Sequence, residues 1–335
     1  MSKRSNSSNR RYDESDARVR APRSKPRRSK DRPDYSAAPI AFVTTVDRGR
    51  ITCLTDAKVI VTAMKARELG KNSVVVGDLI RLDGDVTGNE GTLARAVEVM
   101  PRKNLLSRTV DDIGAFEKSV AANVDQLVIV VAAADPTPRH GFVDRCLVVA
   151  YDQGIEPILV ITKSDLTDPA EFLQSYEALD ISTFVLSVKT GDQKTLGSLR
   201  EKLTGKKSVL IGHSGVGKST LFNALLNSQS RATGDVNFAT GKGRHTSSSA
   251  YALELPDGGW IFDTPGVRSF GLEHVDISRV IGAFEELAEA IVKCPKNCSH
   301  IEAGCALNNI SSQGKTFKRV EGLRRILSSS SQPIT

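Results

Sequence analysis

The sequence of 335 residues lacks several features that would mark it as a membrane or secreted protein. No stretch approaches the roughly 18 uninterrupted apolar residues of a membrane span. The basic N-terminus has no apolar stretch of the kind found in secretory signals. The five cysteines are unevenly placed, which argues against a secreted disulfide framework. We therefore expect a cytoplasmic protein with no membrane association, long enough for two or three domains with their own cores.

Residues 1–38 are almost free of large apolar side chains but contain twelve Lys and Arg residues against five acidic ones. This tail thus accounts for the whole formal net charge of +7. Because it can bury too little surface to offset the entropy of ordering, we predict that it is disordered. Arg-rich tails of this kind often bind nucleic acid through phosphates. A solubilising tail without a partner and a nuclear-targeting signal are the alternatives, although nothing else in the chain supports the second.

Residues 39–104 form the next predicted domain, in which short β-forming segments alternate with glycines. The expected strands are 40–46, 50–54, 59–63, 79–82 and 92–99. Five strands in so short a domain predict a small closed barrel of the OB-fold type, and an SH3-like barrel fits nearly as well. Phe42 is the only aromatic residue in these strands, which favours contacts with the shape or phosphates of a nucleic acid over base stacking.

Residues 105–272 alternate apolar strands with helices, after a basic connector at 102–108. The expected strands are 126–133, 157–162, 183–187, 208–211, 250–255 and 260–264, and the expected helices are 140–152, 169–179, 194–203 and 220–226. This alternation predicts a parallel, doubly wound α/β sheet. Residues 273–335 are predicted to be helical, with helices at 277–291 and 316–327.

A glycine-rich phosphate loop lies between a predicted strand and a predicted helix, which is the context that such a loop needs. Its glycines allow backbone N–H groups to converge on phosphate oxygens, and the helix N-terminus adds a favourable dipole. Lys218 is expected to reach the β- and γ-phosphates, and Ser219 to bind Mg²⁺. The loop consists of Gly212, His213, Ser214, Gly215, Val216, Gly217, Lys218, Ser219 and Thr220.

Two further segments are suited to recognising guanine. Thr162, Lys163, Ser164 and Asp165 follow the end of a predicted strand. The Asp165 carboxylate can accept hydrogen bonds from the guanine N1–H and exocyclic amine, a donor pair that adenine lacks. Lys163 is expected to pack its stem along the base plane, and Thr162 stands where such motifs usually have Asn. Ser187, Val188 and Lys189 end the next strand, where a backbone N–H could meet the guanine O6.

Residues for Mg²⁺ and the γ-phosphate complete this set. Asp263 can hold Mg²⁺ through a water, Gly266 can donate an N–H to the γ-phosphate, and Thr246 can complete the Mg²⁺ sphere as a switch residue. Together these motifs predict a guanine-nucleotide domain. In ordinary small GTPases the base-selecting motifs come last; here they precede the phosphate loop, so the domain is circularly permuted.

Four possible metal ligands lie within twelve residues near the C-terminus, namely Cys294, Cys298, His300 and Cys305. Three thiols and one imidazole form a complete tetrahedral ligand set, which predicts a structural rather than a catalytic Zn²⁺. Cys53 and Cys146 each stand alone in an apolar segment and are expected to be core residues.

In these motifs and in their order, residues 39–327 resemble the RsgA/YjeQ family of bacterial GTPases that depend on the small ribosomal subunit. The resemblance implies an OB-type barrel, a permuted GTPase domain and a C-terminal zinc module. It also implies that GTP hydrolysis is stimulated by the small (30S) subunit and assists its late maturation, with nucleotide state controlling binding and release. The implied cofactors are GTP or GDP, Mg²⁺ and one structural Zn²⁺, and the implied partners are the 30S subunit and its rRNA. We expect a monomer.

The motifs above do not include a group that activates the attacking water. Position 267 is Val where Ras-like enzymes have a water-orienting Gln, so intrinsic hydrolysis should be slow. His245, in the predicted switch loop, is the candidate beside Lys218 and Thr246, and the family resemblance implies the same assignment. The alternative is that His245 is an ordinary solvent-exposed loop residue.

Two other functions remain possible at this point. One is a GTP-regulated tether for RNA or protein in which hydrolysis is incidental. The other is a nucleotide kinase, which would share the phosphate loop but would not require the base-selecting segment at 162–165.

Overall fold

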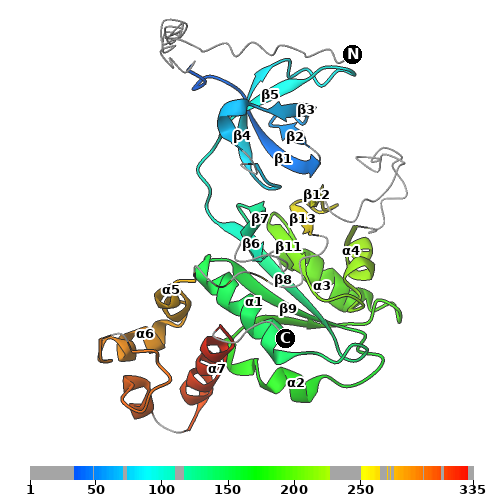
Figure 1. The fold of residues 1–335 in the computed structure, drawn as a ribbon. Helices are drawn as coiled ribbons and strands as arrows, with labels where there is room; N and C mark the ends of the chain where they lie inside the picture. Colours follow the sequence, from blue (N-terminus) through cyan, green and yellow to red (C-terminus); the bar gives the residue numbers. More distant parts are fainter. Residues whose placement is uncertain are drawn as a thin grey trace, which may run out of the picture. The chain divides into compact units, whose positions relative to one another are not determined.

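The computed structural model describes residues 34–47, 49–70, 74–109, 117–226, 250–264, 270, 272, 275–296, 298–310 and 313–330 (Figure 1). Most of the predicted basic tail and the candidate residues His245, Thr246 and Gly266 lie outside these ranges. All five cysteines are free thiols. None of the helices in the part of the chain that the structure describes combines the length and apolarity needed to cross a bilayer.

The first domain is a closed five-stranded barrel, as predicted. Its strands are β1 (Ile40–Asp47), β2 (Arg50–Thr55), β3 (Ile60–Lys65), β4 (Leu79–Gly84) and β5 (Ala94–Val99). They pair in the order β1-β2-β3-β5-β4, and β4 pairs back with β1 to close the barrel. Because the chain crosses over between β3 and β5, these two strands are parallel. This connectivity is that of an OB-type barrel.

The barrel interior follows the two-residue period of its strands. Ala41 and Val43 on β1 and Ile51 and Cys53 on β2 are fully buried, while the residues between them are more exposed. Burial raises the pKa of the Cys53 thiol to about 12, so this cysteine is an inert core residue, as expected.

The second domain contains the predicted parallel sheet. Its strands are β8 (Gln126–Ala132), β9 (Glu156–Thr162), β10 (Ser182–Val185), β11 (Lys207–Ile211), β12 (Tyr251–Glu254) and β13 (Trp260–Asp263). They lie in the order β10-β9-β8-β11-β13-β12, and all neighbours are parallel except β12, which runs antiparallel to β13. The other edge of β12 pairs with β1 of the barrel at Thr45 and Tyr251.

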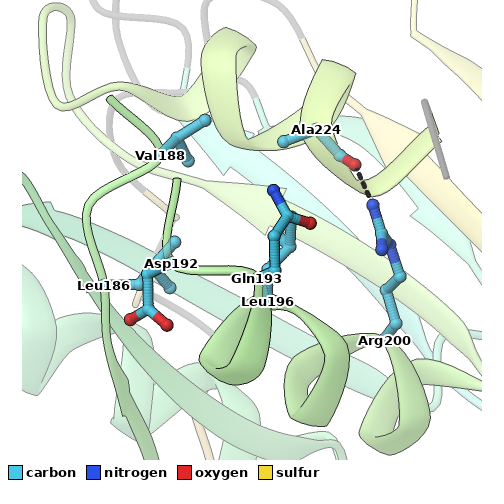
Figure 2. A pocket seen from close by; sticks show the side chains of 7 residues that line it. All are labelled: Leu186, Val188, Asp192, Gln193, Leu196, Arg200 and Ala224. Atoms are coloured by element: carbon cyan, nitrogen blue, oxygen red, sulfur yellow. Dashed lines mark hydrogen bonds between the residues drawn. The ribbon is translucent and has the colours of Figure 1, made fainter. Parts of the chain in front are cut away.

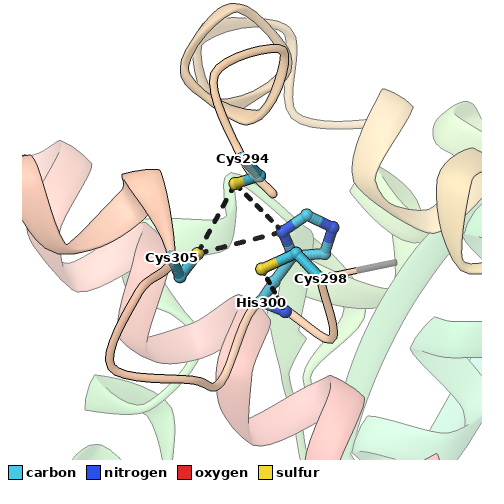
Figure 3. Close-up of side chains that lie close together, drawn as sticks. All are labelled: Cys294, Cys298, His300 and Cys305. Atoms are coloured by element: carbon cyan, nitrogen blue, oxygen red, sulfur yellow. Dashed lines mark hydrogen bonds between the residues drawn. The ribbon is translucent and has the colours of Figure 1, made fainter. Parts of the chain in front are cut away.

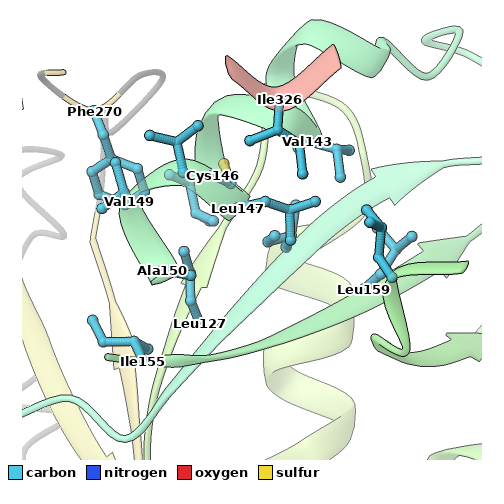
Figure 4. Packing of buried hydrophobic residues seen from close by; sticks show 14 of the residues in the cluster. Leu127, Val143, Cys146, Leu147, Val149, Ala150, Ile155, Leu159, Phe270 and Ile326 are labelled. Atoms are coloured by element: carbon cyan, nitrogen blue, oxygen red, sulfur yellow. The ribbon is translucent and has the colours of Figure 1, made fainter. Parts of the chain in front are cut away.

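Helices cover both faces of this sheet, because alternate residues of each buried strand point to opposite sides. On β8, Leu127 and Ile129 belong to the core beneath α1 (His140–Asp152), whereas Val128 and Val130 belong to the core beneath α3 (Gln193–Leu203) and α4 (Lys218–Leu226). Figure 4 shows Leu127 and Leu159 of the sheet facing Val143, Cys146 and Leu147 of α1. The predicted burial of Cys146 is therefore confirmed.

The C-terminal helices share the core of α1. Val280 of α5 (Ile277–Gly282), Leu287 of α6 (Glu285–Ile291) and Leu323 and Ile326 of α7 (Lys315–Ser330) belong to the same buried cluster as the α1 residues. Ile326 is visible against α1 in Figure 4. An ion pair adds to this contact, since Nε of the half-buried Arg325 lies 2.9 Å from Oδ2 of the buried Asp144.

Two long predicted helices are interrupted in the structure. The helix expected at 277–291 divides into α5 and α6 at Ala283 and Phe284, immediately after Gly282, whose helix propensity is poor. The helix expected at 169–179 is α2 (Ala170–Gln174) followed by the 3₁₀ turn η3 (Glu177–Leu179). Two further 3₁₀ turns are η2 (Arg67–Leu69) and η4 (Ala306–Asn309).

The prediction of a basic connector at 102–108 was wrong. Residues Leu105–Thr109 form strand β6, which pairs with β7 (Glu117–Ala122) in a two-stranded antiparallel sheet. Leu106 is completely buried, whereas Arg102 forms an ion pair with Asp78, a barrel residue with no exposed surface. The strand was not predicted because only one side of it enters the core, so its short apolar pattern is interrupted by the basic residues around Leu105 and Leu106.

The barrel contacts the second domain through the backbone of Val76 and Gly77. The Ala122 N–H donates to the Val76 carbonyl at 2.9 Å, and the Asn123 side chain donates to the Gly77 carbonyl at 3.0 Å. A Cβ atom on Gly77 would lie 2.1 Å from the Ala122 carbonyl oxygen and 2.9 Å from the Phe262 ring. This close approach therefore requires glycine.

We predict that Gly77→Ala destabilises the protein by about 1–3 kcal/mol more than Gly84→Ala, because overpacking costs that amount. Gly84 is a matched control: its φ of 93° is close to the 91° of Gly77, but the nearest atom to an added Cβ is 4.0 Å away. Urea unfolding of the two variants measures the difference. Equal losses in the free energy of unfolding would mean that the contact of Gly77 with Ala122 and Phe262 accommodates a methyl group without cost.

Candidate nucleotide and metal sites

The predicted nucleotide-binding segments gather at one edge of the parallel sheet. The loop at 162–165 follows β9, that at 187–189 follows β10, the phosphate loop follows β11, and Asp263 ends β13. The carboxyl ends of parallel strands meet at the same edge, where α/β proteins bind ligands. From β10 to β13, the sheet therefore presents the base-selecting residues first, then the phosphate loop, then the candidate Mg²⁺ residue.

The phosphate loop has the backbone that its glycines were expected to allow. Gly215 and Gly217 have φ values of 82° and 85°, which favour glycine. A Cβ on Gly212 would lie 2.5 Å from the Val130 carbonyl oxygen. Helix α4 begins at Lys218, and the side chains of the following Ser219 and Thr220 are exposed. Backbone N–H groups, a helix N-terminus and a lysine thus converge at this loop.

His213 of the phosphate loop packs against an aromatic ring. Its imidazole centroid lies 4.3 Å from that of Phe142 on α1. The contact fixes one side of the phosphate loop against the first helix of the domain.

Thr162 joins the base-selecting loop to the phosphate loop. Its hydroxyl, in a residue only 3% exposed, lies 2.5 Å from the carbonyl oxygen of Val216 and 3.2 Å from that of Val131. A single hydroxyl proton donates to these two acceptors, so this position needs a short polar side chain with a donor. Thr supplies one where such motifs usually have Asn, and the link between the two loops is retained.

Asp165 is held by the second base-selecting segment. The Ser187 hydroxyl donates to Asp165 Oδ1 at 2.6 Å, and this hydrogen bond holds the pKa of the Asp165 carboxyl below its usual range. Ser187 is itself buried, so its position is fixed. Lys163 has a positive φ of 55°, and its ammonium group donates a hydrogen bond to the Asp135 carbonyl. The predicted guanine-recognition residues are therefore brought together, with an ionised carboxylate at their centre.

Asp263 accepts hydrogen bonds from two sides. Lys218 Nζ lies 3.1 Å from Oδ1, and the Tyr251 hydroxyl donates to Oδ2 at 3.2 Å. Burial, followed by the Asp263 charge, raises the pKa of Tyr251 to about 12, so the phenol remains a neutral donor. The contact of Lys218 with Asp263 joins two predicted site residues. Tyr251 was not identified as a site residue from the sequence, because a tyrosine in an apolar strand has the pattern of an ordinary core residue.

A small pocket of about 160 Å³ adjoins the base-selecting side of the site. Figure 2 shows it between Val188, α3 and α4, where Arg200 donates to the carbonyl of Ala224. Ligand pockets usually exceed about 300 Å³. The space is therefore too small for a nucleotide and belongs to the packing behind the loop at 187–189.

The four predicted zinc ligands lie together in the C-terminal domain, with ligand atoms all within 4.8 Å of one another (Figure 3). Cys294 Sγ lies 3.8 Å from Cys305 Sγ and 3.6 Å from His300 Nδ1. A tetrahedral Zn²⁺ with Zn–S bonds of about 2.3 Å and a Zn–N bond of about 2.0–2.1 Å requires separations of about 3.8 and 3.6 Å. Together with the 3.9 Å between Cys305 Sγ and His300 Nδ1, the observed separations are close to these values and fit a zinc site.

The surroundings of the cluster also suit a bound metal. The backbone N–H groups of His300 and Ala306 point to Cys298 Sγ and Cys294 Sγ at 3.3 and 3.4 Å, as donors to thiolate ligands do. Burial lowers the pKa of His300, which favours the neutral imidazole that binds metal. His300 has a positive φ of 64°, a conformation uncommon for a residue with a side chain.

Comparisons with known proteins agree with this arrangement. Residues 99–273 match the family model of the RsgA GTPase. Small ribosomal subunit biogenesis GTPase RsgA from Hahella chejuensis is 37% identical over 266 residues, covering 76% of this chain and 73% of that protein. The protein of the same name from Nitrosospira multiformis is 32% identical over 320 residues, covering 90% and 95%.

Solved structures show the same fold. A crystal structure of YjeQ from Thermotoga maritima superposes with a TM-score of 0.65 at 26% identity, covering 87% of this chain and 97% of that one. The structure of YloQ, a circularly permuted GTPase, gives a TM-score of 0.59 at 21% identity, with coverage of 90% and 98%. The chain therefore belongs to the RsgA family of circularly permuted GTPases.

Proposed function

We propose that this protein hydrolyses GTP while bound to the small ribosomal subunit and assists late maturation of that subunit, with nucleotide state controlling binding and release. The observation that carries the proposal is the joining of the two base-selecting segments and the phosphate loop through Thr162, Asp165 and Ser187 at one sheet edge. The relatives named as small ribosomal subunit biogenesis GTPases supply the biological context.

Each part of the site has a proposed role in binding GTP and Mg²⁺. Asp165 selects guanine, Lys163 packs along the base, and the loop after β10 meets the guanine O6. The backbone of the phosphate loop and Lys218 bind the phosphates. The proposed Mg²⁺ residues are Ser219, Thr246 and Asp263, and Gly266 is proposed to donate to the γ-phosphate.

The ribosomal partner is proposed to complete the catalytic apparatus. Val267 cannot orient a water, so we assign His245 as the residue that does so and expect low activity without the subunit.

The proposed domains are a basic tail (1–38), the barrel (39–104), the GTPase domain (105–272) and the zinc-binding domain (273–335). The tail, the barrel and the basic C-terminal helix are proposed to contact rRNA, in a cytoplasmic protein that acts as a monomer.

We predict that purified small subunits accelerate GTP hydrolysis by this protein and leave ATP hydrolysis at background. The reason is that an adenine base leaves the Asp165 carboxylate without its donor pair. Phosphate release from each nucleotide, with and without subunits, measures both effects. A tether with incidental hydrolysis predicts no stimulation, and a nucleotide kinase predicts transfer to an acceptor nucleotide, so either result would remove the proposal.

We predict that His245→Ala lowers the subunit-stimulated turnover by about 10²–10⁴-fold, the range of general acid–base contributions. GDP affinity should stay unchanged, because the proposed role concerns only the attacking water. The control is His274→Ala, which removes a histidine that is not among the proposed site residues and should leave the stimulated turnover unchanged. Stimulated turnover that survives the loss of His245 would show that another group activates the water.

We predict one zinc ion per chain, lost in the Cys298→Ser variant. Structural zinc sites contribute directly to folding, so this variant should also melt at a lower temperature. Metal analysis of the purified protein and a thermal melt test both points. Cys53→Ala, which removes a cysteine in the barrel core, should keep the metal; zinc retained by Cys298→Ser would contradict the assigned ligand set.

A further inference from the structure

Tyr251 makes a contact with Asp263 that the recognised GTPase motifs do not include. Its hydroxyl donates to Oδ2 of the carboxylate at 3.2 Å, while Lys218 Nζ lies 3.1 Å from Oδ1. The side chains of Lys218 and Asp263 are each only 18% exposed. A hydrogen bond to an ionised carboxylate that is largely shielded from solvent is stronger than one between neutral groups. The two donors fix the plane of the carboxylate.

The surroundings of Tyr251 hold the phenol in one place. Its ring meets Phe222 of α4 edge-on, with centroids 5.9 Å apart. Its backbone lies opposite Asp263 on β13 and, across the other edge of β12, opposite Thr45 on β1. Tyr251 is therefore held at both edges of β12, by the four-residue ladder with β13 and by the single residue pair with Thr45.

We propose that Tyr251 is a positioning residue that orients Asp263 toward the Mg²⁺ shell of the bound nucleotide. The inference rests on the function proposed above, in which Lys218 binds phosphate and Asp263 holds Mg²⁺ through water. Lys218 then shares its donors with the phosphates, and Tyr251 holds Oδ2 so that Oδ1 faces the phosphate loop. Tyr251 touches neither nucleotide nor metal and acts through Asp263 alone.

The test is the Mg²⁺ dependence of nucleotide binding and of subunit-stimulated hydrolysis in Tyr251→Phe. This change removes the hydroxyl and keeps the ring that packs on Phe222. A fluorescent GDP analogue reports nucleotide binding, and released phosphate reports hydrolysis. We expect the Mg²⁺ concentration for half-maximal response to rise roughly tenfold, since a hydrogen bond to a charged group contributes at least that much.

Two controls separate positioning from a general loss of structure. GDP affinity in the presence of a chelator should match the wild type, whereas a merely structural defect would weaken it as well. Tyr151→Phe removes a phenol hydroxyl from α1, far along the chain from Asp263, and should leave the Mg²⁺ dependence unchanged. In an Asp263→Ala background, which removes the acceptor, Tyr251→Phe should have no additional effect, as a double-mutant cycle requires of a residue that acts through Asp263.

The outcomes distinguish this inference from the proposed function. A wild-type Mg²⁺ dependence in Tyr251→Phe, or an undiminished effect in the Asp263→Ala background, overturns the positioning role while leaving the GTPase proposal intact. A wild-type protein in which neither guanine-nucleotide binding nor subunit-stimulated GTP hydrolysis depends on Mg²⁺ overturns both.

Discussion

Parallel pairing of the strands from β10 to β13 is the constraint on which the candidate nucleotide site depends. In a parallel sheet every strand ends at the same edge, so the neighbours of a loop are fixed by strand order and not by chain order. Here β9 and β10 come before β11 in the sequence, yet β8 lies between β9 and β11 in the sheet. The loops at 162–165 and 187–189 therefore reach the base side of the phosphate loop although the chain enters the domain elsewhere. Circular permutation changes the connections outside this edge and leaves the edge itself intact.

Bonds between loops turn this shared edge into a site with defined geometry. Thr162 joins the base-selecting loop to the phosphate loop at Val216, and Ser187 fixes Asp165. Both donors are almost completely buried. A buried hydroxyl without an acceptor is costly, so each bond is retained only while the two loops keep their spacing. This explains why Thr can stand in the place of Asn: the position requires a short donor that reaches the Val216 carbonyl, and a hydroxyl satisfies that requirement.

Much of this architecture could be predicted from the sequence, because its strongest patterns are local. The strand at 126–133 was predicted from a continuous apolar run and the helix at 140–152 from an apolar face, and the structure contains both. Strand β6 was missed because Arg102 and Arg108 flank the two leucines of a segment with one buried side. The division between α5 and α6 was missed because one glycine interrupts an otherwise helical stripe. The contact of Tyr251 with Asp263 depends on antiparallel register, which no local pattern contains.

The C-terminal helices constrain how a nucleotide signal can leave the GTPase domain. Val320, Leu323, Ile326 and Leu327 of α7 are buried in the core that includes α1. Burying such side chains stabilises by about 1.5–3 kcal/mol each, so detaching α7 would cost on the order of 6–12 kcal/mol. Coupling between two ligand sites usually amounts to about 1–3 kcal/mol, and a ligand shifts an equilibrium only by its difference in affinity. Exchange of one nucleotide for another therefore cannot lift α7 from α1. The response must consist of smaller movements that leave this core closed, and the carboxylate of Asp263, at the end of β13, is where such a movement can begin.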